Sequence, residues 1–259
     1  MSIPVLFLHG WAMSGAVFDD VAARLGPDFT CHAPDLTGCG EGGGVTSLED
    51  CASVAERWTE QLDRPILVGW SMGAAAAWRY VKRHGTSALR ALVTIDMSPR
   101  MLPDADWGLG LIGQSAEAIL ATSEKIVPTW PRLSQSISRN MFARGSTPTL
   151  SREAAQALLR AQDPAGLRPL WDDLVAMDAR EVISQIDVPY LVCTGSQSRL
   201  YSEAVAHWIA SKAPRAAVAR FEHSGHSPHL EEPEAFCDAI RSFVAAEGLA
   251  MPLKYREEI

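Results

Sequence analysis

Short apolar runs alternate along the chain with segments in which apolar residues recur at helical spacing. The runs that predict short buried strands are Val5–Leu8, Phe29–Ala33, Ile66–Gly69, Ala91–Ile95, Tyr190–Cys193 and Ala217–Phe221. The segments that predict helices are Ala16–Leu25, Leu48–Leu62, Gly73–His84, Ser202–Ala213 and Pro233–Ala246. Repeated alternation of strand and helix predicts an α/β fold, with a mostly parallel sheet covered by helices on both faces.

The alternation is interrupted between Met97 and Asp187. This stretch has helical patterning, clearest in Arg152–Arg160 and Leu167–Met177, and no convincing strand. We therefore expect a core made of residues 1–97 and 187–250, a helical cap at residues 98–186, and a polar C-terminal tail at residues 251–259.

Composition and charge narrow the possible functions. The chain has 259 residues, of which 47% are apolar and 21% charged, as in a folded enzyme-sized domain. Its net charge of −8 disfavours nucleic acid as a partner. The five cysteines form no C-x-x-C pair, and no signal peptide or bilayer-spanning apolar run is evident, so we expect a cytoplasmic protein without a membrane partner.

The strongest chemical signal is the sequence Gly69-Trp70-Ser71-Met72-Gly73. It stands directly between a predicted strand and a predicted helix, which is the context that a G-x-S-x-G nucleophile turn requires. A serine on such a sharp turn exposes its hydroxyl, and the helix N-terminus favours developing negative charge. Ser71 is therefore the predicted nucleophile.

A serine hydroxyl needs a general base, and His226 is the best candidate among the seven histidines. It lies in a loop between the last predicted strand and the last predicted helix, between the small residues Gly225 and Ser227. His223 and His229 are rivals because they lie close by in the same segment.

The segment His9-Gly10-Trp11 ends the first predicted strand. Gly10 permits a sharp turn there, so the backbone N–H of Trp11 and that of Met72 are expected to point at one place and form an oxyanion hole. His9 itself is expected to be structural.

These three segments together resemble the α/β-hydrolase family, in the family's order and at its usual intervals. Within the family the chain is most similar to carboxylesterases of the pimeloyl-acyl-carrier-protein methyl ester esterase type, a similarity that extends to Pro233–Phe236. The resemblance implies an α/β-hydrolase fold with a cap insertion. One departure is expected: the predicted strand that bears His9 is the first in the chain, so two N-terminal strands common in the family should be missing or reduced here.

The triad acid departs from the usual family pattern. In the Gly-x-x-Asp position after the penultimate strand this chain has Ser198, which cannot stabilise an imidazolium by charge. Some family members place the acid one strand earlier, where this chain has Asp96, so Asp96 is the predicted acid. Four other aspartates are weaker rivals: Asp172, Asp173, Asp178 and Asp187.

The predicted cap has an uneven charge distribution. Between Lys125 and Arg168 there are seven basic and two acidic residues, which suits either an acidic acyl-carrier protein or a substrate with a carboxylate, or is simply a solvated surface. The residues expected to contact substrate are Trp11, Trp107, Trp130, Phe142, Arg139 and Arg144, with Trp171 as a further candidate.

The leading hypothesis is a serine hydrolase that cleaves a carboxylic ester or thioester through an acyl-enzyme, without cofactor or metal. An acyltransferase would use the same residues. A cofactor-free dioxygenase of this fold would use His226 and Asp96 but not Ser71. A binding protein without activity is a further alternative, although it would not need an activated nucleophile.

Overall fold

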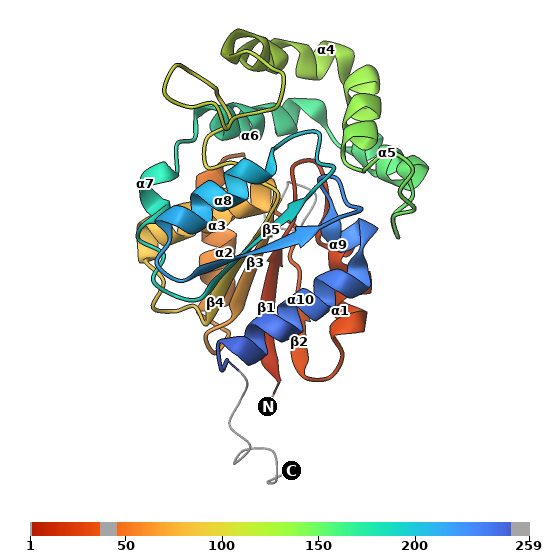
Figure 1. Cartoon of the computed structure of the whole chain (residues 1–259). Helices are drawn as coiled ribbons and strands as arrows, with labels where there is room; N and C mark the ends of the chain where they lie inside the picture. Colours follow the sequence, from red (N-terminus) through yellow and green to blue (C-terminus); the bar gives the residue numbers. More distant parts are fainter. Residues whose placement is uncertain (1, 37–45, 250–259) are drawn as a thin grey trace.

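The computed structural model describes residues 2–36 and 46–249 and contains a six-stranded parallel sheet (Figure 1). The predicted tail at residues 251–259 lies outside the described residues. The strands are ordered β2-β1-β3-β4-β5-β6 across the sheet, and every neighbouring pair is parallel. Their bounds are β1 Ile3–Leu8, β2 Phe29–His32, β3 Ile66–Trp70, β4 Ala91–Ile95, β5 Tyr190–Gly195 and β6 Ala216–Phe221.

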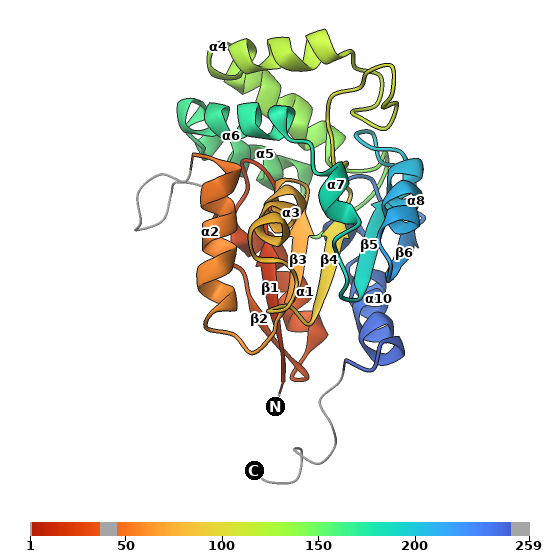
Figure 2. The same ribbon diagram turned by 90° about the vertical axis from the view of Figure 1, so that its left-hand side faces the viewer.

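Helices cover both faces of this sheet, each over its own apolar cluster (Figure 2). Leu6 and Leu8 of β1 face a cluster that includes α2 (Leu48–Thr59), α3 (Met72–His84) and α8 (Glu203–Lys212). Val5 and Phe7 point the other way, toward α1 (Asp19–Leu25) and α10 (Pro233–Ala246). Successive strand residues point to opposite faces, so both faces of a buried parallel strand are apolar.

The predicted α/β-hydrolase architecture is confirmed, with differences at the element ends. Strand β1 begins at Ile3, two residues before the predicted Val5. The predicted helix Ala16–Leu25 is divided into a 3-10 turn, η1 (Gly15–Phe18), and α1. Helix α2 ends at Thr59 and not at Leu62. Among the described residues the sheet is entirely parallel.

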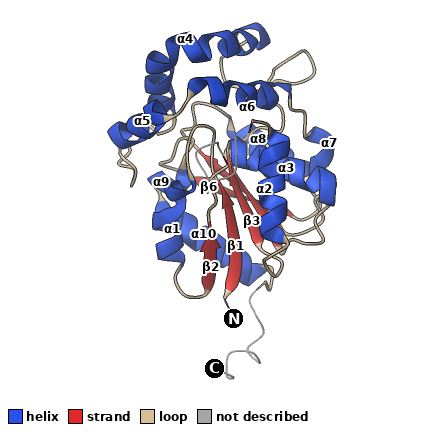
Figure 3. Ribbon diagram, turned by 180° about the vertical axis from the view of Figure 1, so that it is seen from behind, coloured by secondary structure: helices blue, strands red, loops and turns tan. Residues whose placement is uncertain are grey.

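Residues 98–186 lie between β4 and β5, and we call them the cap segment. Its helices are α4 (Ala116–Asn140), α5 (Arg152–Ala161), α6 (Pro164–Ala176) and the short α7 (Arg180–Ile183). Figure 3 shows α4, α5 and α6 above the carboxyl end of the sheet and α7 beside α3. The division of the chain into core and cap stays a prediction.

Helix α4 is the longest described helix, and its sequence pattern alone did not define it. It contains Pro128 and Pro131, and proline normally ends a helix because it lacks an N–H and its ring collides with the preceding turn. Here α4 continues through both prolines and bends along its course (Figure 1). None of the described helices has the length and apolar character needed to cross a bilayer.

His9 lies fully buried where β1 ends. Its Nε2 accepts a hydrogen bond from the Leu36 amide at 2.7 Å, so the ring is held in a neutral form. Burial lowers the pKa of His9 from 6.5 to about 4. The residue therefore fastens the turn after β1 to the chain that follows β2.

We predict that His9 makes the fold sensitive to acid. Below pH 6.5 the unfolded chain takes up a proton that folded His9 refuses until about pH 4, so stability falls across that window. The loss through His9 is on the order of 3 kcal/mol. In urea titrations at the two ends of this range, His9→Gln, which keeps an acceptor, should lose less stability than wild type. The exposed His207→Gln is the control, and equal losses in both variants would contradict the assignment.

Candidate active site

Ser71 lies on a sharp turn between β3 and α3. Its backbone has φ 53° and ψ −116°, a conformation that costs energy for any residue with a Cβ. The Ser71 amide donates to the Ile95 carbonyl at 3.0 Å, which joins the turn to the end of β4. The hydroxyl is thereby presented at the carboxyl edge of the sheet.

The turn depends on a close approach between α3 and β1. A Cβ on Gly73 would stand 1.9 Å from the carbonyl oxygen of Leu8, where no atom fits. Only glycine allows the first turn of α3 to lie against the end of β1. This contact also brings the segment after β1, with Trp11, next to Ser71.

His226 and Asp96 form a buried pair beside this turn. His226 Nδ1 lies 2.7 Å from Asp96 Oδ2, and the exposed fractions of the two side chains are 5% and 0%. Asp96 follows β4 and has a positive φ of 45°, which is uncommon for a residue other than glycine. Asp96 contacts only Nδ1, so the second ring nitrogen, Nε2, is free to accept a proton. Ser71 and His226 line the same cavity.

Ser198 lies against the same carboxylate. Its hydroxyl donates to Asp96 Oδ2 at 2.7 Å and accepts from the amides of Leu200 and Tyr201, both at 3.3 Å. The residue at the usual position of the family acid thus supports the acid of the neighbouring strand. The sequence indicated only that Ser198 replaces the usual acid, and this contact was not predicted.

The loop that carries His226 is fixed from two sides. From the core, the Trp70 indole donates to the His226 carbonyl at 2.8 Å. From the cap segment, the Met141 carbonyl accepts from the His226 amide at 3.1 Å and from the Ser227 hydroxyl at 3.1 Å. The backbone of His226 is therefore held between β3 and the segment after α4.

Glu231 strengthens the junction between this loop and the cap segment. One carboxylate oxygen accepts from the Ala143 amide at 2.7 Å, and the other accepts from the amides of Gly225 at 2.8 Å and Ser227 at 3.3 Å. Burial raises the pKa of Glu231 although these hydrogen bonds oppose the rise. The two chains touch so closely that a Cβ on Gly225 would stand 2.6 Å from the Ala143 nitrogen.

The sequence predicts that the backbone amides of Trp11, which lines the cavity, and Met72, which follows Ser71, form an oxyanion hole. Met72 is the first residue of α3, where amides have no partner within the helix. Within the described ranges, neither amide donates a hydrogen bond to another protein group. Both are therefore available to an oxygen atom bound near Ser71.

The rival residues are engaged elsewhere. His223 is exposed, and His229 is fully buried between the rings of Phe18 and Trp70, where burial lowers its pKa to about 3. Among the rival aspartates, Asp173 accepts from the Leu48 amide, Asp178 pairs with Arg180, and Asp187 accepts from the Thr86 hydroxyl. Asp172 lies near Arg168 on α6.

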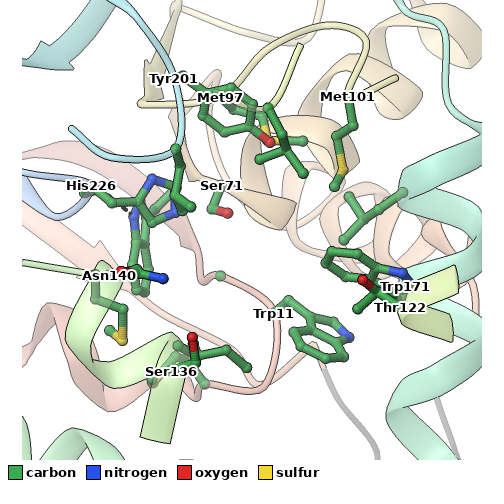
Figure 4. Close-up of a pocket in the computed structure, with 18 of the residues that line it drawn as sticks. Trp11, Ser71, Met97, Met101, Thr122, Ser136, Asn140, Trp171, Tyr201 and His226 are labelled. Atoms are coloured by element: carbon green, nitrogen blue, oxygen red, sulfur yellow. Dashed lines mark hydrogen bonds between the residues drawn. The ribbon is translucent and has the colours of Figure 1, made fainter. Parts of the chain in front are cut away.

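A cavity of about 270 Å³ opens over Ser71 and His226 (Figure 4). Trp11 lines it, as do Trp171 and Tyr201. The remaining lining residues come from the core and from the cap segment: Gly10, Met13, Trp70, Met97, Met101, Leu111, Gln114, Thr122, Leu133, Ser136, Ile137, Asn140, Met141, Leu174 and Leu200.

The other residues predicted to contact substrate are not part of this lining. Trp130 packs behind Trp11, with ring centroids 5.8 Å apart. Trp107 packs against Trp208 and donates to the Arg100 carbonyl. Phe142 is buried, whereas Arg139 and Arg144 point to the exposed surface. Composition identified the aromatic residues but could not show which side of each helix faces the cavity.

Several lining residues were missed by sequence reasoning. Ser136 and Asn140 lie four residues apart on α4, beside the apolar Leu133 and Ile137. A polar pair in an otherwise apolar stripe was a usable signal, but it requires that α4 be recognised first. Among the described residues, no group of three or more His, Cys, Asp or Glu side chains is placed to hold a metal ion.

A model of the alpha/beta hydrolase family matches residues 5–239, which is most of the chain. The chain belongs to the alpha/beta hydrolase family. This α/β hydrolase is 27% identical over 245 residues to a pimeloyl-[acyl-carrier protein] methyl ester esterase of Chromobacterium violaceum, covering 94% of this chain and 95% of the relative. It is 28% identical over 248 residues to the Vibrio vulnificus protein of that name, covering 92% and 93%. The resemblance seen in the motifs is thus confirmed.

Solved structures agree with the hydrolase fold. An esterase from Exiguobacterium antarcticum superposes with a TM-score of 0.85 at 22% identity, covering 94% of this chain and 92% of that one. A bromoperoxidase from Bacillus anthracis superposes with a TM-score of 0.84 at 19% identity, covering 95% and 92%. At these identities the likeness concerns the fold of the α/β hydrolase.

We predict that Asp96 and Ser198 differ strongly in their effect on ester turnover. Asp96→Asn should lower turnover on the order of 10⁴-fold, because the amide favours the wrong imidazole tautomer. Ser198→Ala removes one hydrogen bond to a carboxylate that His226 still contacts, and should cost about tenfold. Steady-state rates of both variants on one p-nitrophenyl ester decide the matter. A larger loss in Ser198→Ala would place the essential group on β5.

Proposed function

We propose that this α/β hydrolase cleaves carboxylic esters through an acyl-enzyme formed on Ser71. The observation that carries the proposal is the 2.7 Å contact between His226 Nδ1 and Asp96 Oδ2, buried beside a serine held on a strained turn. Ser71 and His226 line the same cavity, and Asp96 contacts His226 from behind the lining. The relatives named as esterases support the same reaction.

In the first half of the reaction, His226 Nε2 takes the proton of the Ser71 hydroxyl as its oxygen attacks the ester carbonyl. The carbonyl oxygen becomes negative, and the amides of Trp11 and Met72 stabilise it by hydrogen bonds. Asp96 holds the imidazole in the required tautomer and stabilises its positive charge. His226 then returns the proton to the departing alkoxide, which leaves as the alcohol.

In the second half, water enters and gives a proton to His226 while its oxygen attacks the acyl carbon. The bond to Ser71 breaks, and the serine oxygen regains its proton from His226. An acyltransferase would replace this water by another alcohol or thiol. The relatives named as esterases favour water as the acceptor, so hydrolysis is the simpler assignment.

We predict that Ser71→Ala and His226→Ala each lower ester turnover by several orders of magnitude, with the double variant little worse than either, because the triad acts as a unit. Thermal denaturation should show folded variants. Product formation from a p-nitrophenyl ester is the measurement. Retention of more than about a tenth of the wild-type rate by Ser71→Ala would remove the nucleophile assignment and favour chemistry based on His226 and Asp96 alone.

As the finer assignment, we propose an ester attached to an acyl-carrier protein as the substrate. The sequence relatives carry that substrate in their names. Arg139 directly precedes Asn140 of the cavity lining, and Arg144 follows α4, so exposed positive charge flanks the cavity. Such charge would attract an acidic carrier. Arg152 and Arg168 are less available, since they bond to the Ala143 carbonyl and the Ser123 hydroxyl.

We predict that reversing the charge of Arg139 and Arg144 to Glu lowers kcat/KM for a carrier-linked methyl ester, and that the loss shrinks as salt rises. Turnover of a neutral p-nitrophenyl ester should stay near wild type. Arg57→Glu with Lys82→Glu, on the helices α2 and α3, is the matched control for net charge. Equal losses on both substrates would indicate damage to the cap segment, and no loss would exclude docking at these arginines.

A further inference from the structure

The cavity has two ends of different character on either side of Ser71. In Figure 4, Met97 and Met101 lie on one side of Ser71, and Ser136 and Asn140 on the other. Leu111 and Leu174 also line the cavity and belong to the same buried apolar cluster as Met97 and Met101. We call the part lined by Met97, Met101, Leu111 and Leu174 the apolar lobe.

Each side chain of the apolar lobe is nearly inaccessible to solvent. The exposed fractions are 5% for Met97, 3% for Met101, 7% for Leu111 and 4% for Leu174. A ligand group placed there is therefore shielded from bulk water. It gains from the burial of hydrocarbon, at about 0.8 kcal/mol per methylene group.

The cavity lining offers no countercharge. Among its described members there is no Lys, Arg, Asp or Glu, and the polar residues away from the catalytic centre are neutral: Gln114, Thr122, Ser136 and Asn140. A carboxylate bound in the apolar lobe would be desolvated without a partner, which is strongly unfavourable.

The basic residues of the cap segment do not change this. Arg139 and Arg144 are exposed and lie outside the lining, and Arg100 is paired with Asp104 and Asp178. Positive charge is thus available at the surface, where a carrier docks, and not along the bound chain. The position of these arginines therefore favours contact with an acidic carrier protein over contact with a substrate carboxylate.

From this separation we infer that the enzyme is specific for uncharged acyl chains, and that the apolar lobe rejects an ester whose chain ends in a free carboxylate. The inference rests on the proposed ester hydrolysis and adds the substrate class to it. For a dicarboxylic half-ester whose chain lies in the apolar lobe, the free acid must be masked, as an ester or an amide.

Three matched substrates test this specificity. Methyl hexanoate, dimethyl adipate and monomethyl adipate share the same chain and differ at its far end, which is a methyl group, a methyl ester and a carboxylate. At pH 8, kcat/KM per ester group should be similar for the first two, and about 100-fold lower for monomethyl adipate, the cost of burying an unpaired charge. The loss should appear mainly in KM, because the reacting atoms are unchanged.

Charge placed in the apolar lobe should reverse the discrimination. Met101→Lys is expected to raise the ratio of monomethyl to dimethyl adipate turnover at least tenfold, through a new ion pair. Met101→Gln, of similar size and uncharged, is the matched control and should leave the ratio near wild type. Leu111→Lys is the second variant if Met101→Lys does not fold, as judged by its melting temperature.

The possible results distinguish a failure of the proposed chain specificity from a failure of the proposed ester hydrolysis. Wild-type enzyme that hydrolyses monomethyl and dimethyl adipate within about threefold would overturn the inference and leave the esterase assignment intact. Equal ratios in Met101→Lys and Met101→Gln would also overturn it, because the chain would then not enter the apolar lobe. If none of the three esters were hydrolysed, the proposed function and the inference would both fall.

Discussion

The contact between α3 and β1 determines where everything else in the site can be. With no side chain at Gly73, the helix that begins after Ser71 lies directly on the carbonyl of Leu8. With that approach Ser71 takes a strained backbone conformation and lines the same cavity as Trp11. The strain at Ser71 is sustained by the buried sheet on either side, because β3 is paired with both β1 and β4.

The acid can stand after β4 because parallel strands end at the same edge of the sheet. β4 and β5 are neighbours, so residues that follow the two strands can meet. Asp96, after β4, contacts His226, and Ser198, after β5, donates its hydroxyl to the Asp96 carboxylate at 2.7 Å.

Local signals were sufficient for much of the fold and for the central residues. The strand–turn–helix around Ser71 and the loop around His226 are defined by neighbours in sequence. Asp96 was predicted through the resemblance to family members that place the acid after this strand. The cavity was beyond the sequence because its walls depend on how α4 turns over the sheet. Two prolines within α4 kept the sequence pattern from predicting that helix. Side chains such as Phe142 and Trp107 are buried against partners that no local sequence pattern reveals.

Met141 and Ala143 form hydrogen bonds with the segment that carries His226 and Glu231. The cap segment therefore also helps to hold the histidine backbone in place. In an engineered chimera, a cap borrowed from a relative would bring its own chain past Gly225 and would replace the acceptor that now orients the histidine backbone. In a chimera designed for new substrate specificity, the junction between the two sequences should therefore lie before Met141. A transplant that ends at Asn140 exchanges the α4 residues that line the cavity. It keeps the native Met141 and Ala143, which bond to the segment of His226.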